Sequence, residues 1–168
     1  MIVREEGAGE RPAVLDINRR AFGGGEEATL IEALSRDGDV TLSLVAEQEG
    51  RLVGHILFSP LALTVDGRAV KALALAPMAV LPDMQAKGIG STLVREALKL
   101  AAAGGIEAVI VLGHLGFYPR FGFSHGSVAH IDSPYAQHEE FMGVELAPGA
   151  LAGRAGTCRY ARAFAALS

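Results

Sequence analysis

The spacing of hydrophobic positions along the chain changes as the sequence proceeds. Apolar residues recur three or four positions apart across residues 11–22 and 26–34, and this spacing predicts two amphipathic helices separated by glycines. Three strand-like apolar runs follow at residues 40–47, 52–63 and 70–81, joined by two short glycine turns. Runs of this length with tight turns between them predict an antiparallel meander.

Helical spacing returns at residues 91–103, and a wholly apolar run at 108–112 reads as a buried strand. A strand, a helix and a further strand in this order imply a right-handed parallel crossover. Pro77, which lies inside the third strand of the meander, predicts a bulge or an irregular edge there. Weaker patterns predict three further strands, at residues 2–4, 121–128 and 142–146. We therefore expect an α/β (α+β) protein.

The length of 168 residues suits a single domain over residues 1–168, and the chain has neither an internal repeat nor a dividing linker. Apolar residues make up 50% of the chain and no run is long enough to cross a bilayer, so we expect a cytoplasmic protein with no membrane partner. Its 15 basic and 19 acidic residues show no basic cluster that would bind nucleic acid. We leave the oligomeric state open between monomer and homodimer.

Cysteine and histidine give no sign of a metal centre. Cys158 stands alone, which excludes an internal disulfide and a Cys-rich zinc site, and we expect it to be a buried thiol. His125, His130 and His138 are not at metal-ligand spacing and are expected in loops or at the surface. We therefore expect no metal.

The segment between the third apolar strand and the third helix, residues 82–92, has the features of a phosphate-binding turn. The first N–H groups of a helix lack internal partners and carry partial positive charge. Gly88 and Gly90 let that backbone approach a ligand closely, and Lys87 adds a cation beside it. This arrangement predicts an anion site.

Two familiar phosphate-binding motifs do not fit this turn. A P-loop needs a lysine directly after its glycine, whereas Lys87 precedes Gly88. A dinucleotide-binding motif needs a third glycine where Leu93 stands. It also needs an acidic residue at the end of the next strand, and Glu107 lies at the start of that strand.

A third motif does fit, since Gln85-x-x-Gly88-x-Gly90 after an apolar strand resembles the coenzyme A pyrophosphate loop of the GNAT superfamily of N-acetyltransferases. The resemblance implies the GNAT fold, a mixed, mostly antiparallel central sheet flanked by helices and splayed open at the cofactor site. It also implies acetyl-CoA as co-substrate. The implied cofactor-binding residues are Met78, Ala79, Val80, Gln85, Ala86, Lys87, Gly88, Ile89, Gly90, Ser91 and Thr92.

A second stretch, from Phe117 through Tyr118 to Gly122-Phe123, resembles the aromatic–Tyr–x–x–x–Gly–Phe signature of the same superfamily. The resemblance implies that Tyr118 lies near the coenzyme sulfur and acts as the general acid for the departing thiolate. Thiols ionise near pH 8.5 and phenols near pH 10, so proton transfer is feasible without being strongly driven. The alternative is that Tyr118 is only an aromatic packing residue.

The general base is the missing part of the pattern. Many relatives carry a glutamate in the strand before the loop, but residues 73–78 contain no carboxylate. His114 is our preferred candidate, because it follows the parallel strand and precedes Tyr118. His55, Glu27 and Glu47 are poorer ones.

The predicted function is acetyl transfer from acetyl-CoA to a primary amine of a small molecule or peptide, by direct attack. The alternative is a non-catalytic acyl-CoA sensor on the same fold, which the missing strand carboxylate favours. By resemblance, contacts to the acceptor come from residues 22–34 and 124–140, and their mixed charge does not identify it.

Overall fold

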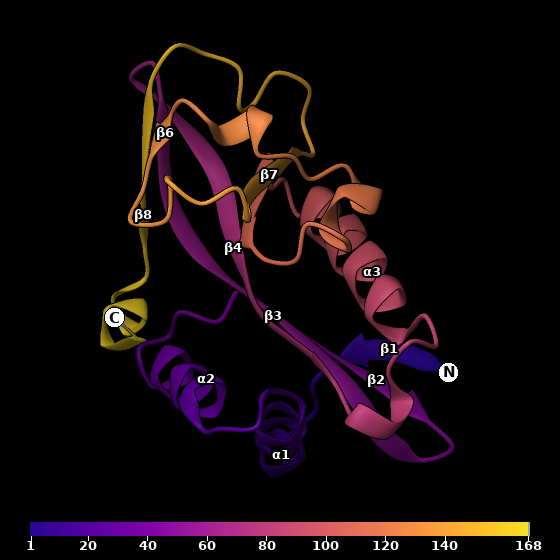
Figure 1. Cartoon of the computed structure of the whole chain (residues 1–168). Helices are drawn as coiled ribbons and strands as arrows, with labels where there is room; N and C mark the ends of the chain where they lie inside the picture. The colour runs from indigo at the N-terminus through magenta and orange to yellow at the C-terminus, as the bar shows by residue number, and fades with distance from the viewer. Residues whose placement is uncertain (168) are drawn as a thin grey trace.

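A central β-sheet separates helices α1 (Arg11–Phe22) and α2 (Glu26–Arg36) from helix α3 (Ile89–Ala103), as Figure 1 shows. The computed structural model describes residues 1–167, so that Ser168, the last residue of the predicted domain, lies outside it. The strands are β1 (Ile2–Glu5), β2 (Leu42–Gln48), β3 (Arg51–Val65), β4 (Arg68–Val80), β5 (Ala108–Leu112), β6 (Ile131–Asp132), β7 (Phe141–Glu145) and β8 (Gly156–Tyr160). Short 3₁₀ turns are η1 (Pro82–Met84), η2 (Tyr118–Phe121), η3 (Gly126–Val128) and η4 (Arg162–Leu167).

The sheet has the order β1-β2-β3-β4-β5-β7, and every neighbouring pair along this path is antiparallel except β4 and β5. The predicted meander is therefore confirmed as β2, β3 and β4. The predicted parallel crossover is confirmed as β4, α3 and β5. The mixed, mostly antiparallel sheet flanked by helices that we expected is the observed fold class.

Helix α1 shows why the helices form where the pattern predicted them. Val14, Leu15 and Ile17 are buried at helical spacing against the sheet. The helix ends at Gly23, whose left-handed φ of 75° lets its N–H reach the carbonyl of Arg19 at 2.9 Å. Glycine adopts this conformation without the steric cost that a side chain would add.

Strand β3 is long enough to hold two partners along one edge. Residues 51–58 pair with β2, and residues 61–65 pair with β8. Strand β8 places Tyr160 opposite Leu61, so the C-terminal segment enters the sheet directly after β2 leaves it. Turn η4 then packs against α2 (Figure 1).

Strands β4 and β5 separate part of the way along β4, as the expected splay required. Their parallel pairing ends at Leu75 and Val111, although β4 continues to Val80. On its other edge, β4 has a register shift opposite residues 56–58 of β3, since Ile56 faces Met78 and Phe58 faces Leu75. The irregularity predicted at Pro77 is therefore present, and it lies where the sheet opens.

The strand predicted at residues 121–128 is wrong. This segment follows η2, contains η3, and has a single isolated bridge between Ser124 and Gly143. Gly122 takes a φ of 95°, which reverses the chain direction and interrupts any extended run. The apolar alternation there instead serves packing, since Phe123 and Val128 are both buried.

Strands β6 and β8 were not predicted at all. In β8, exposed Thr157 and Arg159 flank buried Cys158. The alternation of buried and exposed residues in this strand therefore rests on a single buried position. Cys158 is the buried thiol that we expected, and burial raises its pKa. Too few apolar residues stand in either strand for periodicity to mark them.

Two of the loop histidines hold backbone carbonyls. His125 Nδ1 lies 2.8 Å from the carbonyl oxygen of Phe141, and His130 Nε2 lies 2.7 Å from that of Leu151. In the part of the chain that the structure describes, no three His, Cys, Asp or Glu side chains come together as a metal site would need. Over the same residues, every helix is too short or too polar to cross a membrane.

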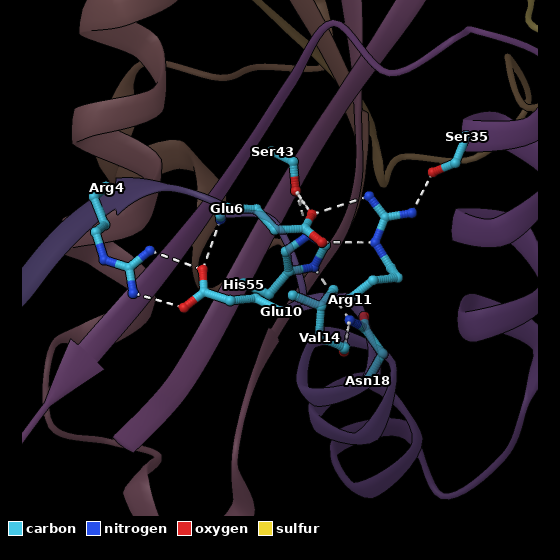
Figure 2. Close-up of polar contacts among 10 residues, drawn as sticks. Arg4, Glu6, Glu10, Arg11, Val14, Asn18, Ser35, Ser43 and His55 are labelled. Carbon is cyan, nitrogen blue, oxygen red and sulfur yellow. Dashed lines mark hydrogen bonds and ion pairs between the residues drawn. The ribbon is translucent and has the colours of Figure 1, made fainter. Parts of the chain in front are cut away.

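A buried chain of hydrogen bonds fixes α1 to the sheet (Figure 2). Asn18 donates from Nδ2 to His55 Nδ1 at 3.1 Å, and His55 Nε2 lies 2.9 Å from the hydroxyl of Ser43. Because the Ser43 hydroxyl donates its single proton to Glu6 at 2.7 Å, His55 must carry its own proton on Nε2. Glu6 is also paired with Arg11 at 2.7 Å, which links α1 to the end of β1.

Burial sets the charge state of this chain. His55 is 0% exposed, and its burial lowers the pKa of the imidazole to about 4, against the opposing attraction of Glu6. Burial also opposes the ionisation of Glu6, but hydrogen bonds from Arg11 and Ser43 outweigh it and lower the pKa of Glu6. A neutral imidazole therefore sits beside an ionised carboxylate at neutral pH.

Candidate functional site

A cavity of about 950 Å³ opens where β4 and β5 separate. One part, which we call the turn side, is lined by Met78, Ala79 and Val80 of β4 and by the turn that leads into α3. The other part, which we call the aromatic side, is lined by Phe22, Glu27, Leu30, Tyr135, Tyr160 and Phe164. The loop after β5, with His114 and Tyr118, lines the same cavity.

The turn side owes its shape to two residues with left-handed backbone. Ala86 has a φ of 62° and Gly88 a φ of 83°, and together they turn the chain from η1 into α3. The side chain of Gln85 donates to the carbonyl of Val80 at 3.0 Å, which holds the turn against the end of β4. A glycine suits position 88 because a side chain would strain this backbone.

The start of α3 offers free backbone donors to the cavity. The first helical hydrogen bond runs from the N–H of Thr92 to the carbonyl of Gly88 at 3.1 Å. The N–H groups of Ile89, Gly90 and Ser91 come before it and have no partner within the helix. Such N–H groups, together with the helix dipole, favour an anion.

Nine of the eleven residues predicted to bind the cofactor line the cavity. The exceptions are Lys87 and Thr92. Lys87 is exposed on the turn beside the cavity. Thr92 donates its hydroxyl back to the carbonyl of Gly88 at 3.0 Å, and so braces the first turn of α3.

Tyr118 lines the cavity and is held there by its neighbours. It is 6% exposed, with the rings of Phe117 and Phe123 edge-on at 5.0 and 5.6 Å. Its hydroxyl makes no hydrogen bond within residues 1–167. Burial raises the pKa of the phenol above its usual range, so it remains protonated and able to donate at neutral pH.

Gly113 makes the position of Tyr118 possible, and it is a residue that sequence reasoning did not single out. A Cβ at Gly113 would lie 2.6 Å from Tyr118 Cδ2 and nearer still to Cε2. The Tyr118 ring therefore occupies the space that any other residue type at position 113 would fill. Only the glycine in the Leu112-Gly113-His114 run hinted at such a close approach.

The structure separates the four candidates for the general base. His114 is exposed and lines the cavity, and Glu27 lines it on the aromatic side. His55 is enclosed in the buried hydrogen-bond chain. Glu47 is paired with Arg4 at 2.9 Å. Neither His55 nor Glu47 lines the cavity.

The aromatic side draws on a segment that the sequence did not implicate. Phe22, Glu27 and Leu30 lie in the first segment expected to contact the acceptor, and Tyr135 lies in the second. Tyr160 and Phe164, however, come from β8 and η4. Two aromatic residues four positions apart near the end of the chain were the available signal.

Comparison with known proteins identifies the family. The family model of the acetyltransferase (GNAT) domain matches residues 3–126. The uncharacterized N-acetyltransferase YhbS of Escherichia coli strain K12 is 33% identical over 162 residues, a match that covers 95% of this chain and 96% of YhbS. The uncharacterized N-acetyltransferase YjhQ of the same strain is 38% identical over 112 residues, which cover 66% of this chain and 62% of YjhQ.

Solved structures extend the likeness beyond the residues of the family model. YhbS from Escherichia coli in complex with CoA superposes with a TM-score of 0.88 at 32% identity, covering 98% of this chain and 91% of that one. A GNAT family acetyltransferase from Brucella melitensis in complex with acetyl-CoA gives a TM-score of 0.79 at 31% identity, covering 97% of both chains. The chain therefore belongs to the GNAT superfamily of N-acetyltransferases.

Proposed function

We propose that this protein transfers the acetyl group of acetyl-CoA to a primary amine of a small molecule or peptide. One observation carries the proposal: a single cavity, at the point where β4 leaves β5, is lined both by the turn at the start of α3 and by Tyr118. Two similar proteins, YhbS and the Brucella acetyltransferase, have been crystallised with CoA and acetyl-CoA.

The turn side suits the diphosphate and pantetheine parts of coenzyme A. The N–H groups of Ile89, Gly90 and Ser91 supply donors for a diphosphate, with Lys87 as a nearby cation. Beyond Leu75, β4 has no partner on its β5 edge. Ala79 and Leu81 direct their backbone groups toward β3, so those of Met78 and Val80 face the open edge. Apart from the Val80 carbonyl, which accepts from Gln85, these groups are available to the pantetheine amides. An extended ligand can add to such an edge as a further strand does.

The transfer requires a neutral amine, a polarised carbonyl and a leaving thiolate. The amine nitrogen attacks the thioester carbon, a C–N bond forms, and the C–S bond breaks as the thiolate leaves. Tyr118 gives its proton to the sulfur, and His114 takes the proton that the amine loses. We assign stabilisation of the carbonyl oxygen to backbone N–H groups at the bulge near Met78.

The raised pKa of Tyr118 bears on the proton transfer to sulfur. Burial penalises the phenolate, but it penalises a free thiolate in the same cavity as well. A hydrogen bond from the phenol to the developing thiolate therefore lowers the barrier even where the proton is not fully transferred.

A second candidate, a non-catalytic acyl-CoA sensor, is favoured by the composition of β4. No residue from Arg68 to Val80 is a carboxylate, so the strand offers no base. Such a sensor would bind acetyl-CoA at the turn side without transferring the acetyl group.

Two measurements separate the candidates. Calorimetry measures acetyl-CoA binding, and a thiol reagent measures CoA release in the presence of polyamines, amino acids, aminoglycosides, arylalkylamines and peptide N-termini. The transferase predicts both binding and amine-dependent thiol release. Binding without release by any amine supports the sensor, and absence of binding refutes both.

A further inference from the structure

The aromatic side of the cavity is built from rings that contact one another. Tyr135 and Tyr160 have centroids 5.3 Å apart at an angle of 76°, and Tyr160 and Phe164 have centroids 5.2 Å apart at 47°. Phe22, at the end of α1, lines the same cavity and is 48% exposed. Four aromatic residues therefore line this part of the cavity, and three of them are in contact.

Glu27 is the one carboxylate among the described residues that line the cavity. It lies in the first turn of α2, is half-buried, and forms no hydrogen bond or ion pair within residues 1–167. Arg120 also lines the cavity, but it donates to the carbonyl of Gly116 at 3.0 Å and stacks on Phe117. The negative charge of Glu27 is therefore available to a ligand.

A carboxylate and aromatic side chains that line one cavity are a suitable environment for an organic cation with an apolar body. The aromatic faces attract the cation electrostatically and pack against the apolar part. The geometry points to a primary monoamine with an aromatic group as the acceptor, held by Glu27 at its ammonium group and by Tyr135, Tyr160 and Phe164 at its ring. Before attack, the bound ammonium releases one proton to solvent, which leaves the neutral amine that the transfer requires. This inference rests on the proposed function, because the bound amine is the one that would receive the acetyl group.

The same residues argue against polycationic acceptors. A polyamine or an aminoglycoside carries several ammonium groups, and each one placed in this cavity would lose water. Only one carboxylate would compensate for that loss, and an unpaired charge in an apolar site is costly.

Tyr160 and the start of η4 are anchored independently of any ligand. Tyr160 is held in the sheet opposite Leu61 of β3. Directly after it, Arg162 forms two hydrogen bonds to Asp37 at the end of α2, at 2.8 and 3.0 Å, which lower the pKa of that carboxyl. An anchored segment selects a ligand by shape more strongly than a mobile one, because less ordering is needed on binding.

The first test compares acceptors at saturating acetyl-CoA. The panel is 2-phenylethylamine, n-butylamine as a primary monoamine without a ring, and spermidine and kanamycin as polycations. Burying a phenyl ring is typically worth about tenfold to hundredfold in an equilibrium constant. We therefore expect kcat/KM for 2-phenylethylamine to exceed that for each of the other three by at least about tenfold.

The second test uses variants of the aromatic side. Glu27→Gln should raise KM for 2-phenylethylamine by about tenfold or more, since it removes a charged partner. Glu26→Gln is the matched control, because the Glu26 carboxylate is adjacent in sequence but is exposed and does not line the cavity. Phe22→Ala and Tyr160→Leu should also raise KM for 2-phenylethylamine. Because Phe22 is largely exposed, we expect Phe22→Ala to fold. Acetyl-CoA affinity should remain unchanged in all four.

A binding measurement distinguishes failure of the inference from failure of the proposed function. Calorimetric titration of 2-phenylethylamine into the CoA-loaded protein does not require turnover. Binding that Glu27→Gln weakens, with no acetylation of any amine, supports the inferred ligand and refutes the transferase. Preferential acetylation of spermidine or kanamycin overturns the inference and leaves the transferase standing. An equal effect of Glu26→Gln and Glu27→Gln, or no binding of 2-phenylethylamine, also overturns the inference.

Discussion

A methyl group added at Gly113 should disable the protein by moving Tyr118 alone. The backbone of Gly113 is not left-handed, so an alanine there avoids left-handed strain, and the three atoms nearest to its Cβ all belong to the Tyr118 ring. Its Cβ would lie 2.6 Å from Tyr118 Cδ2, whereas carbon atoms pack at about 3.5 Å or more. The Tyr118 ring must therefore move by roughly 1 Å, since the Cβ position is set by the backbone.

A displacement of this size has a large predicted effect on rate. A misplacement of about 1 Å in a reacting group can lower the rate by about 10²-fold. Overpacking of a buried site costs about 1–3 kcal/mol of folding stability, which leaves most domains folded. We therefore expect Gly113→Ala to lower kcat by about 10²-fold while acetyl-CoA affinity changes little.

The assay is steady-state thiol release with an accepted amine, together with calorimetry of acetyl-CoA binding and urea unfolding. Gly126→Ala is the control, because its Cβ would meet no atom within 4 Å and its backbone is not left-handed. The double variant with Tyr118→Phe should be about as slow as the slower single variant, since both changes act on one hydroxyl. Wild-type turnover in Gly113→Ala, or losses that multiply in the double variant, would refute the reasoning.

Four further predictions concern the remaining groups. Gly90→Val should weaken acetyl-CoA binding far more than folding, and an unchanged calorimetric affinity would contradict the turn as the diphosphate site. Tyr118→Phe should lower kcat by about 10²–10⁴ with nearly unchanged acetyl-CoA affinity, and wild-type turnover would make Tyr118 a packing residue. His114→Gln should lose turnover that is partly restored at higher pH, because more acceptor is then neutral; a loss independent of pH would exclude His114 as the base. His55 has a folded-state pKa of about 4 against an ordinary value of 6.5, so the unfolded chain takes up its proton first. The free energy of unfolding should therefore fall by about 3 kcal/mol as the pH drops from 6.5 to about 4. The His55→Gln variant, measured by urea unfolding, should lack this dependence on pH. Equal pH profiles for the two proteins would contradict the prediction.

Local sequence patterns were sufficient to predict those elements whose defining residues are contiguous in the chain. The strand over residues 108–112 was predicted with its observed bounds because every position in it is apolar. Helix α1 was likewise predicted from Arg11 to Phe22, since its periodic residues end at a run of glycines. The turn at the start of α3 was recognisable because its glycines, strand and helix are contiguous.

Contacts between distant segments could not be predicted in the same way. The fit of Tyr118 against Gly113 depends on the path of the loop after β5, which no spacing encodes. Strand β8 is specified by its pairing with β3 and shows little alternation of its own. The unpaired state of Glu27 depends on which side chains from distant segments share its cavity.

The two sides of the cavity come from different parts of the sequence, which bears on how acceptor specificity can change among related proteins. The turn side and Tyr118 come from one uninterrupted stretch, whereas the aromatic side combines residues near the start of the chain with residues near its end. If the two sides act as proposed, exchange of the segment from β8 onward between relatives should give a hybrid with a new acceptor preference and an inherited cofactor site. Libraries for altered amine specificity should accordingly vary the two ends of the chain and leave its middle unchanged.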